Sequence, residues 1–80
     1  MLDFKTIVET LVVLASTTKD IEKNIEEIKE IASKIAYTTN AFNDEKANDL
    51  MFDLYYAVVE DEEEAEFILQ LIKKLVNYSA

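Results

Sequence analysis

The amino-acid sequence predicts an all-α protein: one domain over residues 1–80, folded as a small antiparallel bundle of four helices. The chain contains neither Gly nor Pro, the residues that usually interrupt helices and form tight turns. Half of the residues are hydrophobic, which is enough to build a core despite a net charge of −9. Apolar residues recur at alternating spacings of three and four, as they do along one face of a helix, and no useful stretch alternates with the period of a strand.

The first half of the chain carries a ladder of apolar residues with one polar member. The ladder consists of Phe4, Ile7, Leu11, Leu14, Thr18, Ile21, Ile25, Ile28, Ala32 and Ile35. The polar member, Thr18, marks the position where this half is expected to break into two helices. Thr17 and Asp20 have the spacing of a capping box, whose side chains accept hydrogen bonds from backbone N–H groups at a helix start. These features predict helices at 3–16 and 19–39.

A second ladder follows in the other half of the chain. It consists of Ala47, Met51, Leu54, Val58, Asp61, Ala65, Ile68, Ile72 and Leu75. Its polar member, Asp61, again marks a break, so we predict helices at 44–59 and 62–78. In the connection between the two ladders, Asn40 can adopt the left-handed conformation that ends a helix in place of the missing Gly, and Asn43 can cap the next helix.

The same ladders also fit an αα-hairpin of two long helices, 3–39 and 44–78, that dimerises into a four-helix bundle. In that arrangement Asp61 would lie within a buried seam. An aspartate there is costly because it loses water without gaining a partner. The sequence therefore favours four helices.

Two of the predicted helices are apolar on more than one face. The first carries a second stripe of Val8, Val12 and Ala15, and the third carries one of Phe52, Tyr55, Tyr56 and Val59. A helix that is apolar on all sides is normally buried on all sides. The second stripes therefore belong either to the core of a monomer or to an interface between copies. Because a chain of this length has little interior, we predict a homo-oligomer, with a dimer favoured.

A run of carboxylates precedes the last predicted helix. It contains Glu60, Asp61, Glu62, Glu63, Glu64 and Glu66. These residues are expected to fill the cap and the first turns of that helix, where negative charge is favourable. Two acids would be enough to interact with the positive end of the helix dipole, so the dipole does not explain the number of acids in the run. Residues 41–80 carry a net charge of −7 against −2 for residues 1–40, so we predict that this acidic surface binds a basic surface of another protein.

The residue types exclude several classes of function. His, Cys, Trp and Arg are absent, which removes the usual zinc, haem and iron–sulfur ligands and the nucleophilic triads built on His. The negative charge opposes binding to nucleic acid and to membrane surfaces. The N-terminal segment lacks the basic and long apolar stretches of a signal peptide or membrane span. We therefore expect a cytoplasmic protein without a cofactor, and its Lys-, Ile- and Asn-rich composition suits an AT-rich microbial or viral genome.

Two segments, EEIKE at 26–30 and EKANDLMFDLYYAV at 45–58, together resemble the MazG-type all-α nucleoside triphosphate pyrophosphohydrolases. That family places Glu-x-x-Glu on one helix and Glu-x-x-Asp on the next, and these acids hold Mg²⁺ on a triphosphate. The resemblance implies a Mg²⁺ site that includes Glu27, Glu30 and Asp49.

The second motif departs from the family pattern at its first acid. Lys46 occupies the position of that acid, and Glu45 comes one residue early. Asp53 could replace the missing ligand only in a rearranged site. Glu27 and Glu30 on one helix, and Asp49 and Asp53 on the next, also face away from the apolar ladders. Carboxylates in such positions normally belong to a solvated surface.

These observations predict a small acidic helical protein that acts by protein–protein interaction and is not an enzyme. Its apolar faces would mediate self-association, and its acidic surface would bind a basic partner, as an inhibitor or a DNA mimic does. The alternative, implied by the resemblance, is a Mg²⁺-dependent MazG-like pyrophosphohydrolase or a degenerate relative of one.

Overall fold

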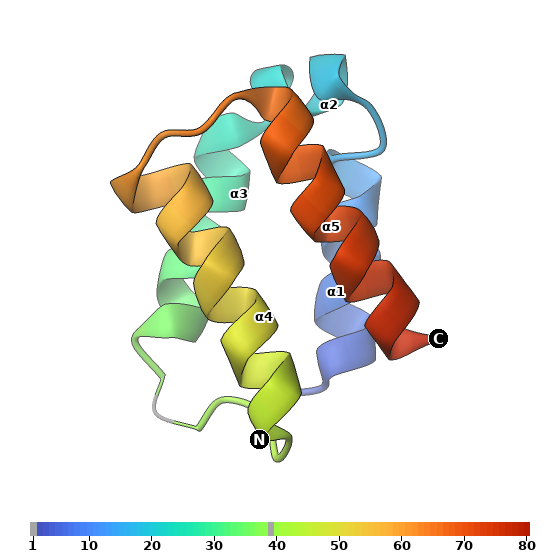
Figure 1. Cartoon of the computed structure of the whole chain (residues 1–80), viewed down its shortest axis with the longest axis vertical. Helices are drawn as coiled ribbons and strands as arrows, with labels where there is room; N and C mark the ends of the chain where they lie inside the picture. Colours follow the sequence, from blue (N-terminus) through green and yellow to red (C-terminus); the bar gives the residue numbers. More distant parts are fainter. Residues whose placement is uncertain (1, 39) are drawn as a thin grey trace.

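The computed structural model describes residues 2–38 and 40–80, and these residues form an all-α antiparallel bundle, as the sequence predicts (Figure 1). No strand occurs among them. The elements in chain order are α1 (Phe4–Leu14), α2 (Thr18–Lys23), α3 (Ile25–Ala36), α4 (Glu45–Tyr55), the π-helical turn η1 (Tyr56–Glu60) and α5 (Ala65–Ser79).

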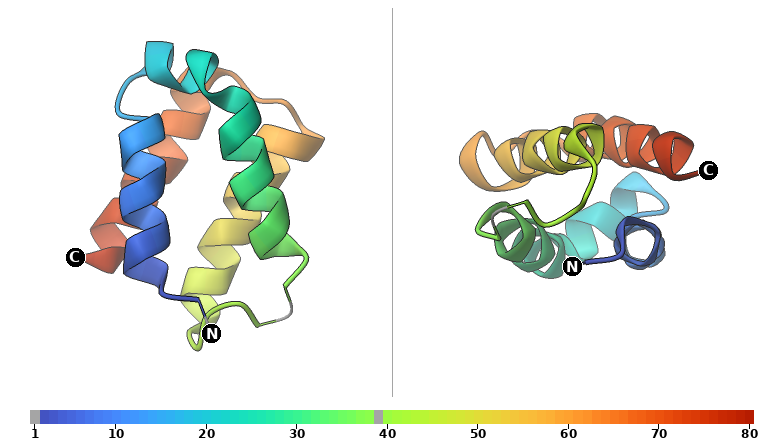
Figure 2. Two further views of the ribbon diagram at one scale, coloured as in Figure 1. Left: turned by 180° about the vertical axis from the view of Figure 1, so that it is seen from behind. Right: turned by 90° about the horizontal axis from the view of Figure 1, so that it is seen from below.

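The four longer helices lie in two layers. Seen from one end in Figure 2, α4 and α5 form one layer, and α1 and α3 form the other. Each helix packs antiparallel to its neighbours around the bundle, in the order α1, α5, α4, α3, while the short α2 lies across one end against the start of α5. The backbone measures 32 × 25 × 16 Å along its principal axes.

The core lies between the two layers, and every α-helix contributes to it. The largest side chains that are fully buried are Leu11, Ile21, Ile28, Leu54, Val58, Ile68 and Leu75. All of them belong to the two apolar ladders. The spacing of three and four thus identifies the inward face of each helix, because it keeps these side chains on one side of the helix axis.

The first ladder breaks where its polar member predicts. The backbone N–H of Asp20 donates to Oγ1 of the N-cap Thr17 at 3.1 Å, and the Ser16 hydroxyl donates to the Asp20 carboxylate at 2.7 Å. These bonds satisfy polar groups at the start of α2 that the helix itself leaves unpaired. The hairpin of two continuous helices is therefore wrong.

The predicted helix 19–39 is divided at Asn24, which the sequence analysis did not anticipate. The backbone of Asn24 turns at φ −106° and ψ 18°. Its side-chain Nδ2 donates to the carbonyl oxygen of Leu14 at 3.0 Å, so the amide serves the end of α1. The second piece, α3, ends at Ala36, and Thr39 lies outside the described residues.

The connection between α3 and α4 confirms one predicted residue and corrects another. Asn40 has the expected left-handed backbone, with φ 50°. The cap of α4 is Asp44 and not Asn43: the Asp44 carboxylate accepts hydrogen bonds from the backbone N–H groups of Lys46 and Ala47, at 3.0 and 3.2 Å. A carboxylate at this position also interacts favourably with the positive end of the helix dipole.

The last helix begins later than predicted. We expected helices at 44–59 and 62–78, but the first of these continues through η1 to Glu60, and α5 begins only at Ala65. The difference arises because η1 is wound more widely than an α-helix, so that the N–H of Asp61 donates to the carbonyl of Tyr56, five residues back, at 2.7 Å. A four-residue connection then leads into α5.

Candidate functional site: an acidic groove beside an exposed carboxylate run

The predicted acidic surface lies at the junction of η1 and α5, at the upper end of the bundle in Figure 1. All of its members are exposed: Glu60, Asp61, Glu62, Glu63, Glu64 and Glu66. The prediction that these acids fill the cap and first turns of the last helix is wrong for the first four. Only Glu64, as the N-cap, and Glu66, in the first turn, stand at the start of α5. Helix polarity therefore does not account for most of the run.

Backbone hydrogen bonds fix the shape of this connection. The N–H of Glu63 donates to the carbonyl of Ala57 at 2.8 Å, which folds the chain back over the end of η1. Between them Glu62 adopts φ 47°, in the left-handed region where Gly is preferred. The carboxylates are thus attached to a defined turn of the backbone.

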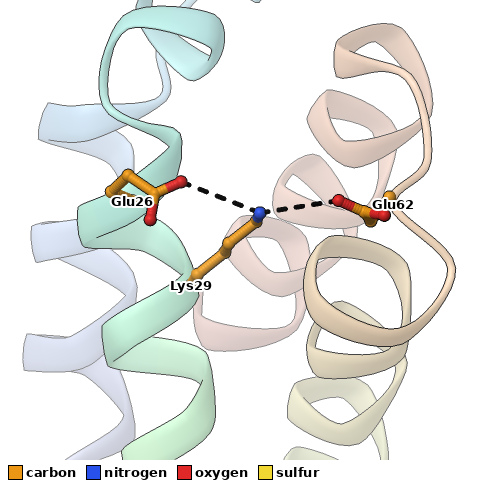
Figure 3. Close-up of polar contacts among 3 residues, drawn as sticks. All are labelled: Glu26, Lys29 and Glu62. Carbon is orange, nitrogen blue, oxygen red and sulfur yellow. Dashed lines mark ion pairs between the residues drawn. The ribbon is translucent and has the colours of Figure 1, made fainter.

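One lysine ties the connection to the neighbouring helix. Lys29 reaches from α3 between two carboxylates, 3.7 Å from Glu26 and 3.8 Å from Glu62 (Figure 3). Both carboxylates are largely exposed, so each pair contributes little to stability. The contact of Lys29 with Glu62 instead places the left-handed turn beside α3.

A shallow groove of about 310 Å³ lies beside the carboxylate run, between α4–η1 and α5. Three carboxylates line it: Asp53 from α4, and Asp61 and Glu63 from the connection. None of the three makes a side-chain hydrogen bond or an ion pair with any other described residue. Lys74 of α5 is the one cationic side chain among the lining residues. The groove is therefore negatively charged, with carboxylates free to bind a cation.

Aromatic rings form the rest of the groove wall. Tyr56 of η1 and Phe67 of α5 line it and remain 52% and 50% exposed. Buried Ala57 and Leu71 contribute apolar surface between the two helices. The site thus combines half-exposed aromatic side chains with carboxylates, an arrangement that favours cations with a hydrophobic stem.

Two tyrosine hydroxyl groups connect α3 and α4 to the end of η1. The Tyr55 hydroxyl donates to Glu60 at 3.3 Å and lies 3.4 Å from the hydroxyl of Tyr37. The hydrogen bond with Tyr37 and the burial of the Tyr55 ring, with the charge of Glu60, raise the pKa of Tyr55 above its usual value. Tyr55 therefore stays protonated and serves to orient Glu60 at the end of η1.

The predicted apolar interface residues divide into two sets. Val8, Ala15 and Tyr55 are buried within the single chain. Phe52 and Tyr56 are exposed, whereas Val12 and Val59 are partly buried. The first set belongs to the core of one copy, and the prediction of an interface between copies now depends on the second set alone.

The acids of the alternative Mg²⁺ site do not converge. Glu27 and Glu30 of α3 and Asp49 and Asp53 of α4 are all exposed, as their phase in the ladders predicts. Glu30 is paired with Lys34 of its own helix at 3.1 Å. In the part of the chain that the structure describes, no three acidic side chains stand close enough together to hold a metal ion. The resemblance to the MazG-type family stays a prediction.

Sequence reasoning missed Phe67 and Lys74, which complete the groove from the α5 side. A signal for Phe67 was present, since a large aromatic residue directly before the ladder residue Ile68 must leave the core face. Its pairing with Tyr56 depends on α4 and α5 being neighbours, which the ladders do not specify. Both residues enter the site through tertiary packing.

The helices of this chain are short and amphipathic. The longest, α5, has 15 residues, and none of the helices described here has the length and apolar character needed to cross a bilayer. Comparisons of this chain with protein-family models, with curated protein sequences and with solved structures found no match.

Proposed function

We propose that this protein acts by protein–protein contact and not by catalysis, and that the acidic groove, together with the carboxylate run at 60–66, binds a basic surface of a partner. The observation that carries this proposal is that Asp53, Asp61 and Glu63 line one groove and have no ionic or side-chain hydrogen-bond partner among the described residues. Surfaces of one sign steer and hold partners of the opposite sign.

Two acids on α3 are less available. Glu26 and Glu30 on α3 each lie within 4 Å of a lysine of the same helix. The half of the chain that contains the groove has ten acids and only three lysines. An inhibitor that covers the nucleic-acid-binding surface of another protein would use such a face, with carboxylates in the places of phosphates.

The test compares two charge-neutralised variants that carry the same net charge. One is the double variant Asp61→Asn, Glu63→Gln in the groove. The other is Glu27→Gln, Glu45→Gln, whose side chains are exposed elsewhere and make no polar contact with a described residue. A labelled peptide of four Gly-Ser-Lys repeats is the probe, and binding is measured by fluorescence anisotropy. We expect the groove variant to lose about threefold or more in affinity, since each exposed charge pair contributes up to about 1 kcal/mol.

The control variant should keep the affinity of the unmodified protein within about twofold. Equal losses in the two variants would show that the peptide senses only the overall charge, and the assignment to this groove would then be wrong. Circular dichroism of each variant establishes that the helices remain folded.

We also propose that the predicted self-association uses the face between α1 and α5. A second groove of about 340 Å³ lies there, lined by Val12 and Val76 with Lys5 and Glu9 at its edge. It carries one charge of each sign and exposes mainly apolar surface. A second copy is therefore repelled less at this face than at the acidic groove, where two surfaces of the same sign would meet.

A further inference from the structure

We propose that the acidic groove receives an arginine side chain of the partner, with the guanidinium lying against Tyr56 and Phe67 and pairing with the carboxylates around them. This inference rests on the proposed function and specifies the chemistry of the partner. It concerns a single side chain within the wider basic surface.

One of the two rings of the groove, that of Tyr56, is held in place before anything binds. Tyr56 packs beside two other rings, with its centroid 5.6 Å from that of Tyr55 and 6.4 Å from that of Phe52. Tyr55 is buried and is hydrogen-bonded to Glu60, so this side of the cluster is anchored in the core. A ring that is already oriented loses little conformational freedom when a cation stacks on it.

Two segments supply the carboxylates that line the groove together with the rings. Asp53 belongs to α4, while Asp61 and Glu63 belong to the connection, whose backbone is fixed by its hydrogen bonds to η1. Lys74 stands on the α5 side and makes no ion pair with a described residue. Three carboxylates against one ammonium leave the groove able to accept a further positive charge.

Arginine fits this combination better than lysine does. Its planar guanidinium stacks on an aromatic face while its N–H groups bond to carboxylates at its edges. It is also more weakly hydrated than an ammonium, so it gives up less on entering a half-apolar groove. A lysine ammonium would satisfy the carboxylates and would gain less from the rings.

The chain itself cannot supply this side chain, since it contains no arginine. A second copy is thereby excluded as the source of the guanidinium. The occupant is an arginine-bearing segment of a different protein. The size of the groove, at the lower end of the range of roughly 300–1,000 Å³ for small-molecule pockets, suits one side chain.

The experiment compares two flexible peptides of equal charge, one of four Gly-Ser-Arg repeats and one of four Gly-Ser-Lys repeats. Each is titrated into the isotopically labelled full chain and followed by the amide signals in nuclear magnetic resonance spectra. We expect the arginine peptide to bind about fivefold more tightly. We also expect it to shift the signals of Tyr56, Asp61 and Phe67 most strongly.

The variant Tyr56→Leu, Phe67→Leu keeps apolar side chains and all charges but removes the two π faces. It should reduce the affinity for the arginine peptide to that for the lysine peptide and change lysine binding little. Tyr78→Leu is the matched control, because Tyr78 is an exposed aromatic residue near the end of α5 that neither lines the groove nor contacts its rings. It should leave the preference for arginine intact. Phe67→Leu alone provides a milder version if the double variant is destabilised.

The possible results separate this inference from the proposed function. If both peptides bind equally and move only the signals of residues 60–66, the acidic surface binds basic partners but the arginine site is wrong. If the preference for arginine survives in the leucine variant, the rings do not cause it and the inference is again wrong. If neither peptide binds, both proposals fail.

Discussion

At the scale of single residues, two of the residues that the structure describes adopt backbone conformations that Gly would normally occupy. Asn40 has φ 50° and Glu62 has φ 47°, and the chain contains no Gly. Asn tolerates the left-handed region because its short polar side chain can bond locally, whereas a Glu there is strained by its Cβ atom. The strain at Glu62 lies directly beside the acidic groove, as backbone strain often does at functional sites.

Replacing Glu62 with Gly should relieve this strain. We expect Glu62→Gly to raise the free energy of unfolding by about 0.5–1 kcal/mol, measured by urea denaturation, because Gly adopts positive φ without a steric penalty. Glu62→Gln is the control, since it removes the ion pair with Lys29 but keeps the Cβ atom. It should be nearly neutral. A Gly variant no more stable than the Gln variant would contradict the presence of strain at this position.

At the scale of elements, the start of α4 is tied to the end of α5 by one carboxylate. Asp44 caps α4 and also accepts the hydroxyl of Tyr78, whose oxygen lies 2.9 and 2.8 Å from the two carboxylate oxygens. The hydrogen bond from Tyr78 and those from the backbone of α4 lower the pKa of Asp44 below 3.8. The same contact raises the pKa of Tyr78. The ionised cap therefore serves two helices at once.

This link predicts a pH dependence with a definite sign. A carboxyl group whose pKa is lowered by folding stabilises the protein above its unfolded pKa, and the contribution is lost as the pH falls through the folded value. We therefore expect Tyr78→Phe to reduce stability at about pH 7 and to differ less from the unmodified protein near pH 3. In the variant, carboxyl titration by nuclear magnetic resonance should show the pKa of Asp44 moving up toward 3.8.

The control for this measurement is Tyr37→Phe, which removes a hydroxyl of the same kind that does not contact Asp44. It should leave the pKa of Asp44 unchanged. If Tyr78→Phe also left that pKa unchanged, the backbone of α4 alone would be responsible for lowering it.

The elements also show which features of a sequence predict structure. The ladders identify the helices and their buried faces because their period is a local property. The break at Asn24 was not predicted, because the amide acts on the carbonyl of Leu14 in another helix. The late start of α5 was missed because a π turn has no distinct pattern of apolar residues. In each case the structure depends on a particular hydrogen bond, which the helix propensities of the residues do not reveal.

At the scale of the whole molecule, net charge decides which partners can approach. Each copy carries a charge of −9, and this repels a second copy while attracting a basic partner. The acidic run of the candidate site was visible in the sequence because it is contiguous. The groove was not, because Asp53, Tyr56 and Phe67 meet only through the packing of α4 beside α5.

The two proposed interactions should therefore respond to salt in opposite directions. Raising the salt from about 0.02 to about 0.5 M shortens the range of electrostatic forces well below 10 Å. We expect self-association, followed by sedimentation equilibrium, to strengthen over this range because the repulsion between copies is screened. Binding of the lysine peptide should weaken over the same range. Self-association that weakened with salt would show that attraction between opposite charges holds the copies together, and the apolar face between α1 and α5 would then be wrong.

The order of the helices around the bundle also bears on how the chain reaches this structure. The helices α3, α4 and α5 follow one another along the chain, so the pairs α3–α4 and α4–α5 each form by closing a short loop. The pairing of α1 with α5 instead joins the two ends of the described chain and closes its longest loop. Loop closure of this kind carries the largest loss of chain entropy. Among the helix pairs of the described bundle, the contact between α1 and α5 thus carries the greatest entropic cost of loop closure.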